Sequence, residues 1–385
     1  MEQAYIVEVL RTAGGRRAGK LAGWHPADLA GELLSALVAA TGVDPCAIED
    51  VILGCVSQVG EQSFHIGRSA VLASTLPDTV PAVTIDRQCG SSQQALHFAA
   101  QAVLSGTQEM VIAAGVESMT RVPIGSPTLL ARQANLGGPW SERILRRYGV
   151  TEFSQFTGAQ MMADKYGFGR GALDAYALES HVRAAAATRS GAFDREIVPI
   201  AIEGGMHRTD EGIRTDATLQ SIGAVKLIKE GGSLTAAHAS QICDGASAAL
   251  IVNERALKTH GLTPLARIHQ LAITAGDPVI MLEEPIPATR KALDRCGLSI
   301  DDIDLFEVNE AFAPVPLAWL QALHADPARL NVNGGAIALG HPLGASGTRL
   351  MATLVHALRA RGLRYGLQTM CEGGGIANAT IIEAL

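Results

Sequence analysis

The sequence predicts an α/β fold in which one unit occurs twice. First, short apolar runs alternate with helical patterns along most of the chain. Second, 48% of the residues are apolar but only 4% are aromatic, and 41 are glycine, which is typical of aliphatic strands and tight turns. Third, this alternation of apolar runs and helical patterns stops after residue 117 and returns after about residue 264, as expected for a repeated unit. At 385 residues, the chain exceeds the usual size of one hydrophobic core, so we expect about two packed units.

The first 117 residues carry a βαβα rhythm. The predicted strands are the runs YIVEVL, VILGCV, VTI and MVIAAG, and the predicted helices span residues 26–40, 67–73 and 93–104. Such alternation predicts a mostly parallel sheet that is covered by helices, with sites at the turns where strands end.

The same rhythm returns after about residue 264. The segment AIEDVILGCV at 47–56 is echoed by SIDDIDLFEV at 299–308, and the helix and strand at 90–117 are echoed at 344–373. Chance similarity between βαβ segments is the alternative explanation. The nearly constant spacing of the two echoes favours a duplicated unit.

An insertion separates the two halves. It contains the turns PIGSP, NLGGPW, GFGRG and EGG around two helical patterns. Residues 119–239 hold 14 Lys or Arg and 12 Asp or Glu, a balance of +2, which favours a phosphorylated ligand here, although a solvated surface explains so small an excess equally well. We predict three parts: a first half at 1–117 plus 241–263, an inserted loop domain at 118–240, and a second half at 264–385.

Charge and cysteine usage exclude several functions. The net charge is -7 and no dense Lys/Arg run occurs, which argues against nucleic acid as a partner. No window reaches the roughly 18 apolar residues of a membrane span, so we expect a cytoplasmic protein without membrane contact. The six cysteines form no C-x-x-C pair, so we expect reduced thiols, no disulfide framework and no metal site.

Cys89 lies in VTIDRQCGSS, after a predicted strand and before a helix that begins near Ser91. Backbone N–H groups at a helix N-terminus stabilise an anion, so we expect the thiol pKa to fall below its ordinary value of about 8.5. Such a thiol is a candidate nucleophile. The alternative is a buried cysteine that only fills space.

Three further segments carry candidate chemistry. His341 lies in GHPLGASG, where glycines and a proline hold the backbone before a helix, and it is the candidate base; a phosphate loop or a tight turn is the alternative. Cys371 precedes three glycines whose N–H groups suit an oxyanion hole, unless they form only a hairpin turn. Asn309 follows a strand, where it can orient water or an oxyanion, or simply form a turn.

Together these motifs resemble those of the thiolase family. CGSSQQA at Cys89, NEAF at 309–312, GHPLGASG at 340–347 and CEGGG at 371–375 occur in the thiolase order and at similar spacing, and they cover nearly the whole chain. The resemblance implies a duplicated βαβαβαββ unit in a five-layered α-β-α-β-α arrangement with an inserted loop domain.

The resemblance also implies a role for each residue. Cys89 would attack the 3-keto carbon of a 3-ketoacyl-CoA, and His341 would take its proton. Cys371 would protonate the departing acetyl-CoA enolate and then deprotonate incoming CoA. Asn309, through a water, would stabilise the enolate oxygen together with His341. The N–H groups of Cys89 and Gly373 would hold the thioester oxyanion.

Positions similar to CoA contacts of the family are Arg214, Ser221 and Ser240, with Met281 and Phe312 along the pantetheine channel. CoA is then a co-substrate, and no permanently bound cofactor is expected. Family members imply a homodimer or a homotetramer.

The resemblance favours a degradative thiolase. Residues 224–229 lack the aromatic-containing stretch of many biosynthetic relatives, and Phe156 stands where those relatives often have His. Formation of acetoacetyl-CoA is the close alternative. Cys371 argues against a β-ketoacyl synthase, the complete set of four motifs argues against a non-catalytic CoA-binding relative, and nothing suggests the peptide cleft of a cysteine protease.

Overall fold

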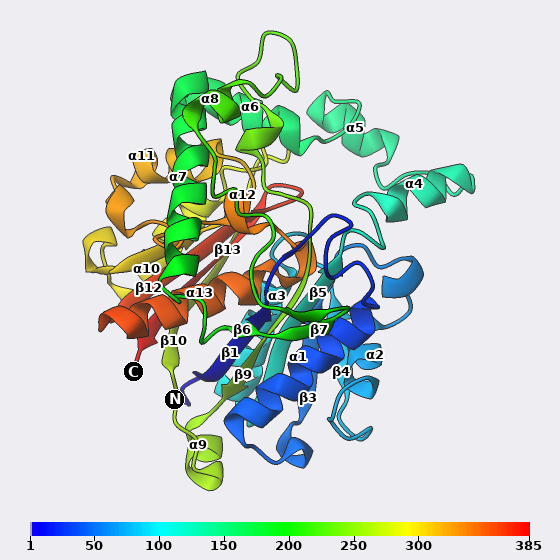
Figure 1. The fold of residues 1–385 in the computed structure, drawn as a ribbon, viewed down its shortest axis with the longest axis vertical. Coiled ribbons are helices and arrows are strands. Elements are labelled where there is room, and N and C mark those ends of the chain that lie inside the picture. The colour runs from blue at the N-terminus through cyan, green and yellow to red at the C-terminus, as the bar shows by residue number, and fades with distance from the viewer. Residues whose placement is uncertain (1) are drawn as a thin grey trace.

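The computed structural model describes residues 2–385 and arranges them as a duplicated α/β fold (Figure 1). The strands of the first half are β1 (Tyr5–Thr12), β2 (Gly15–Arg16), β3 (Asp50–Gly54), β4 (Ala82–Ile85), β5 (Met110–Ser118) and β9 (Cys243–Val252). Those of the second half are β10 (Ala266–Ala275), β11 (Leu305–Val308), β12 (Tyr365–Glu372) and β13 (Ile376–Ala384). Each apolar run that predicted a strand forms one, and the continuous apolar runs of β3 and β5 suit strands that helices cover on both faces.

The strand order is β11-β12-β13-β10-β1-β9-β5-β3-β4. It is symmetric about the junction of the halves, where β1 and β10 pair antiparallel at Tyr5–Arg267 and Ile6–Ala266. The prediction of a mostly parallel sheet is wrong. Strands β3, β4 and β5 pair in parallel, but β9 and β13 each run antiparallel to both of their main neighbours. The cause in the second half is the short CEGGG turn, which folds β13 straight back onto β12 and thus forms a hairpin.

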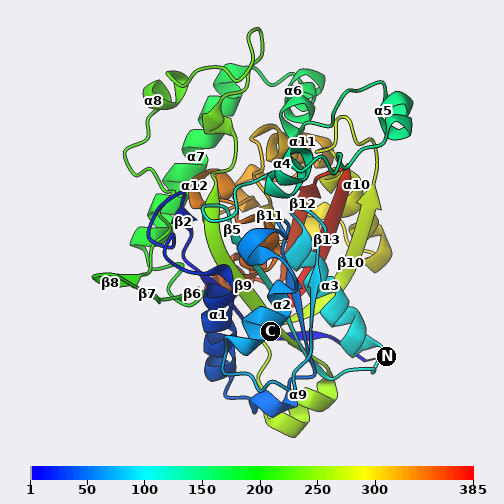
Figure 2. The same ribbon diagram turned by 90° about the vertical axis from the view of Figure 1, so that its right-hand side faces the viewer.

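Helices cover both faces of each half. They are α1 (Pro26–Thr41), α2 (Ile66–Leu72), α3 (Ser91–Leu104), α9 (Glu254–His260), α10 (Pro285–Cys296), α11 (Pro314–Leu323), α12 (Ala336–Leu339) and α13 (Ser346–Arg361). Helices α3 and α13 contact each other and lie between the two halves of the sheet, while α1 and α10 cover the outer faces (Figure 2). The order of layers is therefore α-β-α-β-α, as the resemblance implied.

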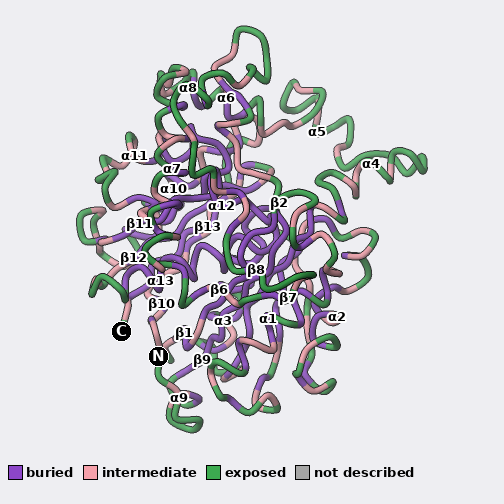
Figure 3. The backbone as a smooth tube through the Cα atoms, viewed as in Figure 1, coloured by how far each residue is buried: buried purple, intermediate pink, exposed green. Residues whose placement is uncertain are grey.

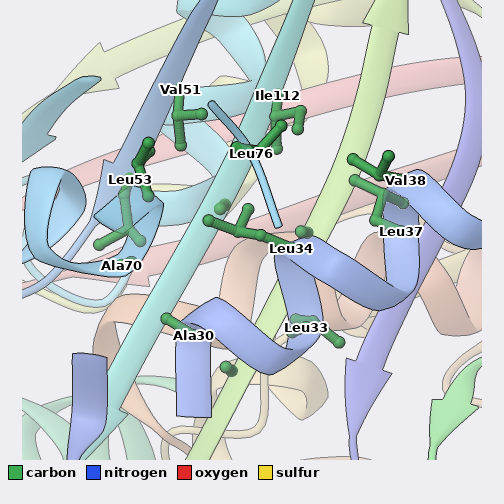
Figure 4. Close-up of a cluster of buried hydrophobic side chains, with 14 of the residues drawn as sticks. Ala30, Leu33, Leu34, Leu37, Val38, Val51, Leu53, Ala70, Leu76 and Ile112 are labelled. Atoms are coloured by element: carbon green, nitrogen blue, oxygen red, sulfur yellow. The ribbon is translucent and has the colours of Figure 1, made fainter. Parts of the chain in front are cut away.

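Three buried clusters fill the spaces between these layers. Under α1, Leu33, Leu34 and Leu37 pack toward Val51 and Ile112 of the first sheet (Figure 4). A second cluster joins α3 and α13 to the inner faces of both halves, and a third packs α10 and α11 on the outer face of the second half. Burial of these apolar side chains holds the layers together.

Helix α1 illustrates how the sequence specifies an element. Pro26 occupies the first helical position, where its missing N–H costs nothing, and the His25 side chain accepts a hydrogen bond from the N–H of Ala27 at 3.2 Å. Leucines at every fourth position, including Leu29 and Leu33, place one apolar stripe against the sheet. Gly42 ends the helix with a φ of 65°, a left-handed conformation that glycine adopts readily.

The insertion contains more helices than the two predicted. They are α4 (Ser126–Gln133), α5 (Glu142–Tyr148), α6 (Gln155–Tyr166), α7 (Arg170–Arg189) and α8 (Leu219–Gly223), with the short strands β6 (Ile197–Val198), β7 (Ile200–Ile202) and β8 (Gly205–His207). Helices α4 and α5 project from the body and are largely exposed (Figures 1 and 3), so they lack the wide apolar stripe that signals a packed helix. The three domain boundaries stay a prediction.

A buried arginine ties the insertion to the first half. Arg11 of β1 is fully buried, and its guanidinium donates to Glu196 at 2.6 Å and to Asp210 at 2.8 Å. Two carboxylates compensate the desolvation of one buried cation. The chain between β5 and β9 is therefore held against β1, in the middle of the sheet, where β6 also pairs with Arg11 and Thr12. No helix within residues 2–385 is long and apolar enough to cross a membrane.

Candidate active site

The second half reaches across to the start of helix α3 in the first half. The N–H of Thr348 donates to the Ser92 hydroxyl at 3.1 Å, and both residues are buried. Gly347 lies so close to α3 that a Cβ there would be 2.0 Å from the backbone N of Gln93. Glycine is required at this contact because any side chain would separate the two helices. Leu343, two residues after His341, thereby packs in one buried cluster with Cys89.

Glu117, at the end of β5, joins two loops of the site, one at residues 56–57 and one at Gly344. Its carboxylate accepts the N–H groups of Val56 at 2.9 Å, Ser57 at 3.0 Å and Gly344 at 2.9 Å. Burial raises the carboxyl pKa, and these hydrogen bonds oppose that rise. The sequence reasoning missed this residue, although an acidic residue that ends an apolar strand was a signal for it.

Cys89 lies where predicted, between β4 and α3, whose first residue is Ser91. The predicted lowering of its pKa is wrong for the free protein. Burial, and then the neighbouring Glu372 carboxylate, raise the thiol pKa to about 12, while a hydrogen bond with the Gln155 side chain opposes the shift. The desolvation of the thiolate outweighs the helix N-terminus. At neutral pH this cysteine is a thiol that needs a base before it can attack.

The imidazole of His341 is neutral, with its Nε2 unprotonated, as a general base requires. Its Nδ1 lies 2.5 Å from the Ser346 hydroxyl, which donates its own hydrogen to the carbonyl of Pro342 at 2.8 Å. Nδ1 must therefore donate, which leaves Nε2 as an acceptor, and Nε2 faces Nδ2 of Asn309 at 3.4 Å. Burial, with the nearby Arg349 cation, lowers the imidazole pKa to about 3. The ring is neutral and can accept one proton.

Asn309 follows β11 and is fully buried, and its N–H donates to the carbonyl of Thr369 at 3.1 Å. Its side-chain Oδ1 has no hydrogen-bond partner within the described chain. The adjacent Glu310 fixes this turn, because its carboxylate accepts from Tyr176 at 3.0 Å and from Ser180 at 2.6 Å. The amide is thus held next to His341 with one free acceptor.

Cys371 and Gly373 lie at the β12–β13 hairpin. The turn explains two of the glycines, since Gly374 and Gly375 have φ values of 91° and 75°. The segment CEGGG therefore forms a hairpin turn with a thiol at its start, and the role of its N–H groups as an oxyanion hole stays a prediction. Burial, then the neighbouring Cys89 and Glu372, raise the pKa of the Cys371 thiol well above its ordinary value. Cys371 is buried and protonated, as an acid must be.

Glu372 is a second residue that the sequence reasoning missed. Its side chain is fully buried against Gly90, and neither carboxyl oxygen has a hydrogen-bond partner within residues 2–385. The thiols of Cys89 and Cys371 both lie near it. Burial raises its pKa to about 8, although the Arg87 cation opposes the shift. The signal for it in the sequence was an acidic residue between Cys371 and three glycines. The carboxyl is therefore largely protonated in the folded protein at neutral pH.

The buried carboxyl of Glu372 should make stability depend on pH. Above a pH of about 4.5, the ordinary pKa of the group, the unfolded chain has released a proton that the folded chain keeps until about pH 8. Raising the pH through this window therefore lowers the free energy of unfolding, by at most about 1.4 kcal/mol per unit. Glu372→Gln removes this loss, so its free energy of unfolding relative to wild type should rise by roughly 3 kcal/mol from pH 5 to pH 8.

Urea unfolding followed by circular dichroism at several pH values would measure this difference. Glu254→Gln, at an exposed position at the start of α9, is the matched control and should follow wild type at every pH. If the Glu372→Gln curve also runs parallel to wild type, the carboxyl is not protonated in the folded state.

Two of the predicted CoA contacts come together. Arg214 and Ser221 line one small cavity of about 40 Å³, together with His181, whose Nδ1 accepts the N–H of Arg214 at 3.2 Å. Ser221 also caps α8, since its hydroxyl donates to the carbonyl of Thr218 at 2.9 Å. Both predicted contact residues are exposed on the insertion.

Ser240 and Phe312 lie together at another wall of the site. The N–H of Ser240 donates to the carbonyl of Ala311 at 3.0 Å, and the Phe312 ring meets Phe156 edge to face at 5.2 Å. Met281 belongs to the same buried cluster as Phe312 and lines a cavity of about 790 Å³ that also includes Gly373. Of the predicted CoA positions, Arg214 and Ser221 therefore line one cavity and Met281 lines another.

Comparison with known proteins gives matches over both halves. The family description "Thiolase, N-terminal domain" matches residues 4–255, and "Thiolase, C-terminal domain" matches residues 262–384. The steroid 3-ketoacyl-CoA thiolase FadA6 of Mycobacterium tuberculosis is 52% identical, over 100% of this chain and 95% of its own length. A 3-ketoacyl-CoA thiolase of Citrobacter koseri is 38% identical, over 100% of this chain and 99% of its own length.

Solved structures agree with the sequence matches. The Bacillus anthracis acetyl-CoA acetyltransferase superposes with a TM-score of 0.91 at 36% identity, and the human mitochondrial 3-ketoacyl-CoA thiolase with a TM-score of 0.89 at 35% identity. Each alignment covers 100% of this chain and 99% of the other chain.

Proposed function

Because this chain belongs to the thiolase family, we propose that it is an acyltransferase that cleaves 3-ketoacyl-CoA with CoA. The products are acetyl-CoA and an acyl-CoA shortened by two carbons, as in β-oxidation. The observation that carries the proposal is a pair of neighbouring thiols, one of them at the start of α3, with a segment packed against it that holds a neutral imidazole beside a buried amide. The names of the sequence relatives support cleavage of a 3-ketoacyl-CoA.

The first half-reaction forms a covalent intermediate. Sγ of Cys89 attacks C3 of the substrate while Nε2 of His341 takes the thiol proton. The C2–C3 bond then breaks, and its electron pair stays on C2 as the enolate of acetyl-CoA. Cys371 donates its proton to C2, which releases acetyl-CoA and leaves the acyl group on Cys89 as a thioester.

The second half-reaction returns the protein to its starting state. The Cys371 thiolate takes the proton of incoming CoA, and the CoA sulfur attacks the acyl carbon. The C–S bond to Cys89 breaks, and the leaving sulfur recovers its proton from His341. Transfer between two thiols keeps the thioester energy, whereas capture by water would lose it. Burial of both cysteines supports this requirement for a dry site.

Oxyanion stabilisation lowers the barriers to both half-reactions. In the proposal, the N–H groups of Cys89 and Gly373 hold the thioester oxygen of the intermediate, while Asn309 and His341 hold the enolate oxygen. The free Oδ1 of Asn309 supports the participation of a water there, and CoA enters past Arg214, Ser221 and Ser240. Hydrogen-bond donors aimed at such an oxygen are worth about 10²- to 10³-fold in rate.

A thiolysis assay tests the proposal. The purified protein should convert 3-ketoacyl-CoAs of graded length and bulk to acetyl-CoA and a shortened acyl-CoA, and only when CoA is present. Absence of acetyl-CoA from every substrate would contradict it. Formation of acetoacetyl-CoA from two acetyl-CoA molecules, the reverse chemistry, is the second candidate, and the Bacillus anthracis structure named acetyl-CoA acetyltransferase favours it. Incubating the protein with acetyl-CoA alone gives the rate of acetoacetyl-CoA formation. Comparison of that rate with the rate of 3-ketoacyl-CoA cleavage distinguishes the two functions.

We also propose a cytoplasmic homodimer or homotetramer with CoA as its co-substrate and no permanently bound cofactor. A reducing compartment suits the free cysteines of the site. Assembly is supported by the exposed Phe64, Leu72 and Val83 in and beside the edge strand β4. A single-chain mass in sedimentation velocity would contradict the assembly.

A further inference from the structure

We infer that the cavity of about 790 Å³ beside Gly373 holds the acyl group of the substrate, and that this acyl group ends in a carboxylate bound by Arg143 and Arg147. The inference rests on the proposed function and deepens it, because it names the class of substrate. A 3-ketoacyl-CoA with a carboxylate at the far end of its chain has the chemistry that these residues would recognise.

The cavity begins at the reactive groups. Gly373 lines it, only two residues from Cys371, and so does Gln155, whose side chain is close enough to the Cys89 thiol to lower its pKa. Gln88, the residue before the nucleophile, lines it as well. An acyl group attached to Cys89 can therefore extend into this space. Its volume is within the range of small-molecule sites, about 300 to 1,000 Å³.

The outer wall comes from the projecting part of the insertion. Trp140 and Tyr148 line the cavity, and each meets the ring of Phe153 edge to face, at 5.5 Å and 5.7 Å. This aromatic group gives an apolar surface along which a hydrocarbon chain can pack. The sequence analysis had assigned no role to these residues.

Two arginines in this wall have no acidic partner among residues 2–385. Arg143 and Arg147 lie one turn apart on α5, and no Asp or Glu accompanies them in the lining of the cavity formed by residues 2–385. Arg121 and Arg183 of the same insertion pair with Glu61 and Glu179, but no ion pair is found for these two in the described chain.

The spacing of the two arginines favours one anion between them. Like charges at i and i+4 destabilise a helix slightly, and an anionic ligand removes that cost. Guanidinium groups donate two parallel hydrogen bonds to a carboxylate, which gives both affinity and orientation. The guanidinium of Arg147 lies over the Tyr148 ring at 5.3 Å from its centroid, so its position is already restricted.

A phosphate of CoA is the other anion that this chemistry could bind. The predicted contacts for CoA, Arg214 and Ser221, line a different cavity. That separation favours the acyl carboxylate as the ligand of Arg143 and Arg147. The two sources are separable by experiment, since every substrate carries the CoA phosphates but only some carry a carboxylate.

The test compares two probes of equal chain length. 3-Ketoadipyl-CoA ends in a carboxylate and 3-ketohexanoyl-CoA in a methyl group. Wild type should cleave the first with the higher kcat/KM. Arg143→Gln with Arg147→Gln should lower kcat/KM for 3-ketoadipyl-CoA about tenfold to a hundredfold and change that for 3-ketohexanoyl-CoA less than about twofold. Arg146→Gln, on the same helix but outside the cavity, is the matched control and should behave as wild type.

Two other kinetic results would overturn the inference. An equal loss on both probes, with a raised KM for CoA, would assign the arginines to a CoA phosphate and overturn the inference. Unchanged kinetics on both probes would overturn it too. If neither probe is cleaved, calorimetry with adipyl-CoA and hexanoyl-CoA and the Cys89→Ala protein decides the question without catalysis. Equal affinity for both would refute the carboxylate site, whereas tighter adipyl-CoA binding would support it and leave only the proposed function in doubt.

Discussion

Incubation with a 3-ketoacyl-CoA in the absence of free CoA is expected to leave an acyl group on Cys89. The thioester should accumulate because the second half-reaction lacks its thiol. Mass spectrometry of the intact protein should show the added acyl mass, and a digest should place it on the peptide that contains residue 89. Only Cys89 combines a position at the start of α3 with the neutral His341 base that its raised pKa requires.

The substitution Cys89→Ala should abolish both the label and turnover. We expect kcat to fall about 10³-fold or more, because the remaining groups cannot form the covalent intermediate. Cys296→Ala is the control, since its thiol lies at the far end of α10 and donates to the carbonyl of Ala292 at 3.2 Å. That variant should be labelled and active. An acyl group on any cysteine other than Cys89 would overturn the assignment of the nucleophile.

Cys371→Ala should separate acylation from carbon–carbon bond chemistry. The variant is expected to accept an acyl group on Cys89 from a simple acyl-CoA, because that step needs only the Cys89 thiol and the His341 base. Cleavage and condensation should fall about 10²- to 10⁴-fold, since the enolate then lacks its acid and base. Stopped assays would measure the three reactions, and retained full turnover would refute the role of Cys371.

Exchange of hydrogen for deuterium gives a second readout for Cys371. Wild type should exchange the methyl protons of acetyl-CoA with heavy water, because removal of one such proton begins condensation. Cys371→Ala should lose this exchange while it keeps acylation. Thermal unfolding should confirm that the variant is folded, since removal of one buried sulfur is expected to destabilise the protein by only about 1 to 2 kcal/mol. Exchange at the wild-type rate would identify another base.

Much of the fold was predictable because local periodicity carries it. The leucine stripe of α1 repeats about every 3.6 residues, and the first strand is a short, nearly continuous apolar run. Neither signal depends on distant contacts. The helix start at Ser91 was equally clear. Helices α4 and α5 were missed because they are short and exposed, and no buried face imposes a period on their sequence.

The site was predictable as a set of motifs, but its electrostatics were not. The prediction of a low pKa for Cys89 used only the neighbouring helix, whereas burial and a carboxylate 283 positions away decide the actual direction. Glu117 and Gln155 were missed for a related reason. Neither belongs to a motif, and their contacts with the site come from the packing of segments far apart in the chain.

By itself, the sequence determined the α/β class, the duplication and the motifs that contain Cys89, Asn309, His341 and Cys371, whose roles we propose. Only the tertiary structure decided that the sheet is mixed, that both thiols and Glu372 are protonated, and that two unpaired arginines line the cavity beside Gly373. The physical reason is the distance over which each interaction acts. Periodicity and turn chemistry act between neighbours in the chain, whereas desolvation and charge act between neighbours in space.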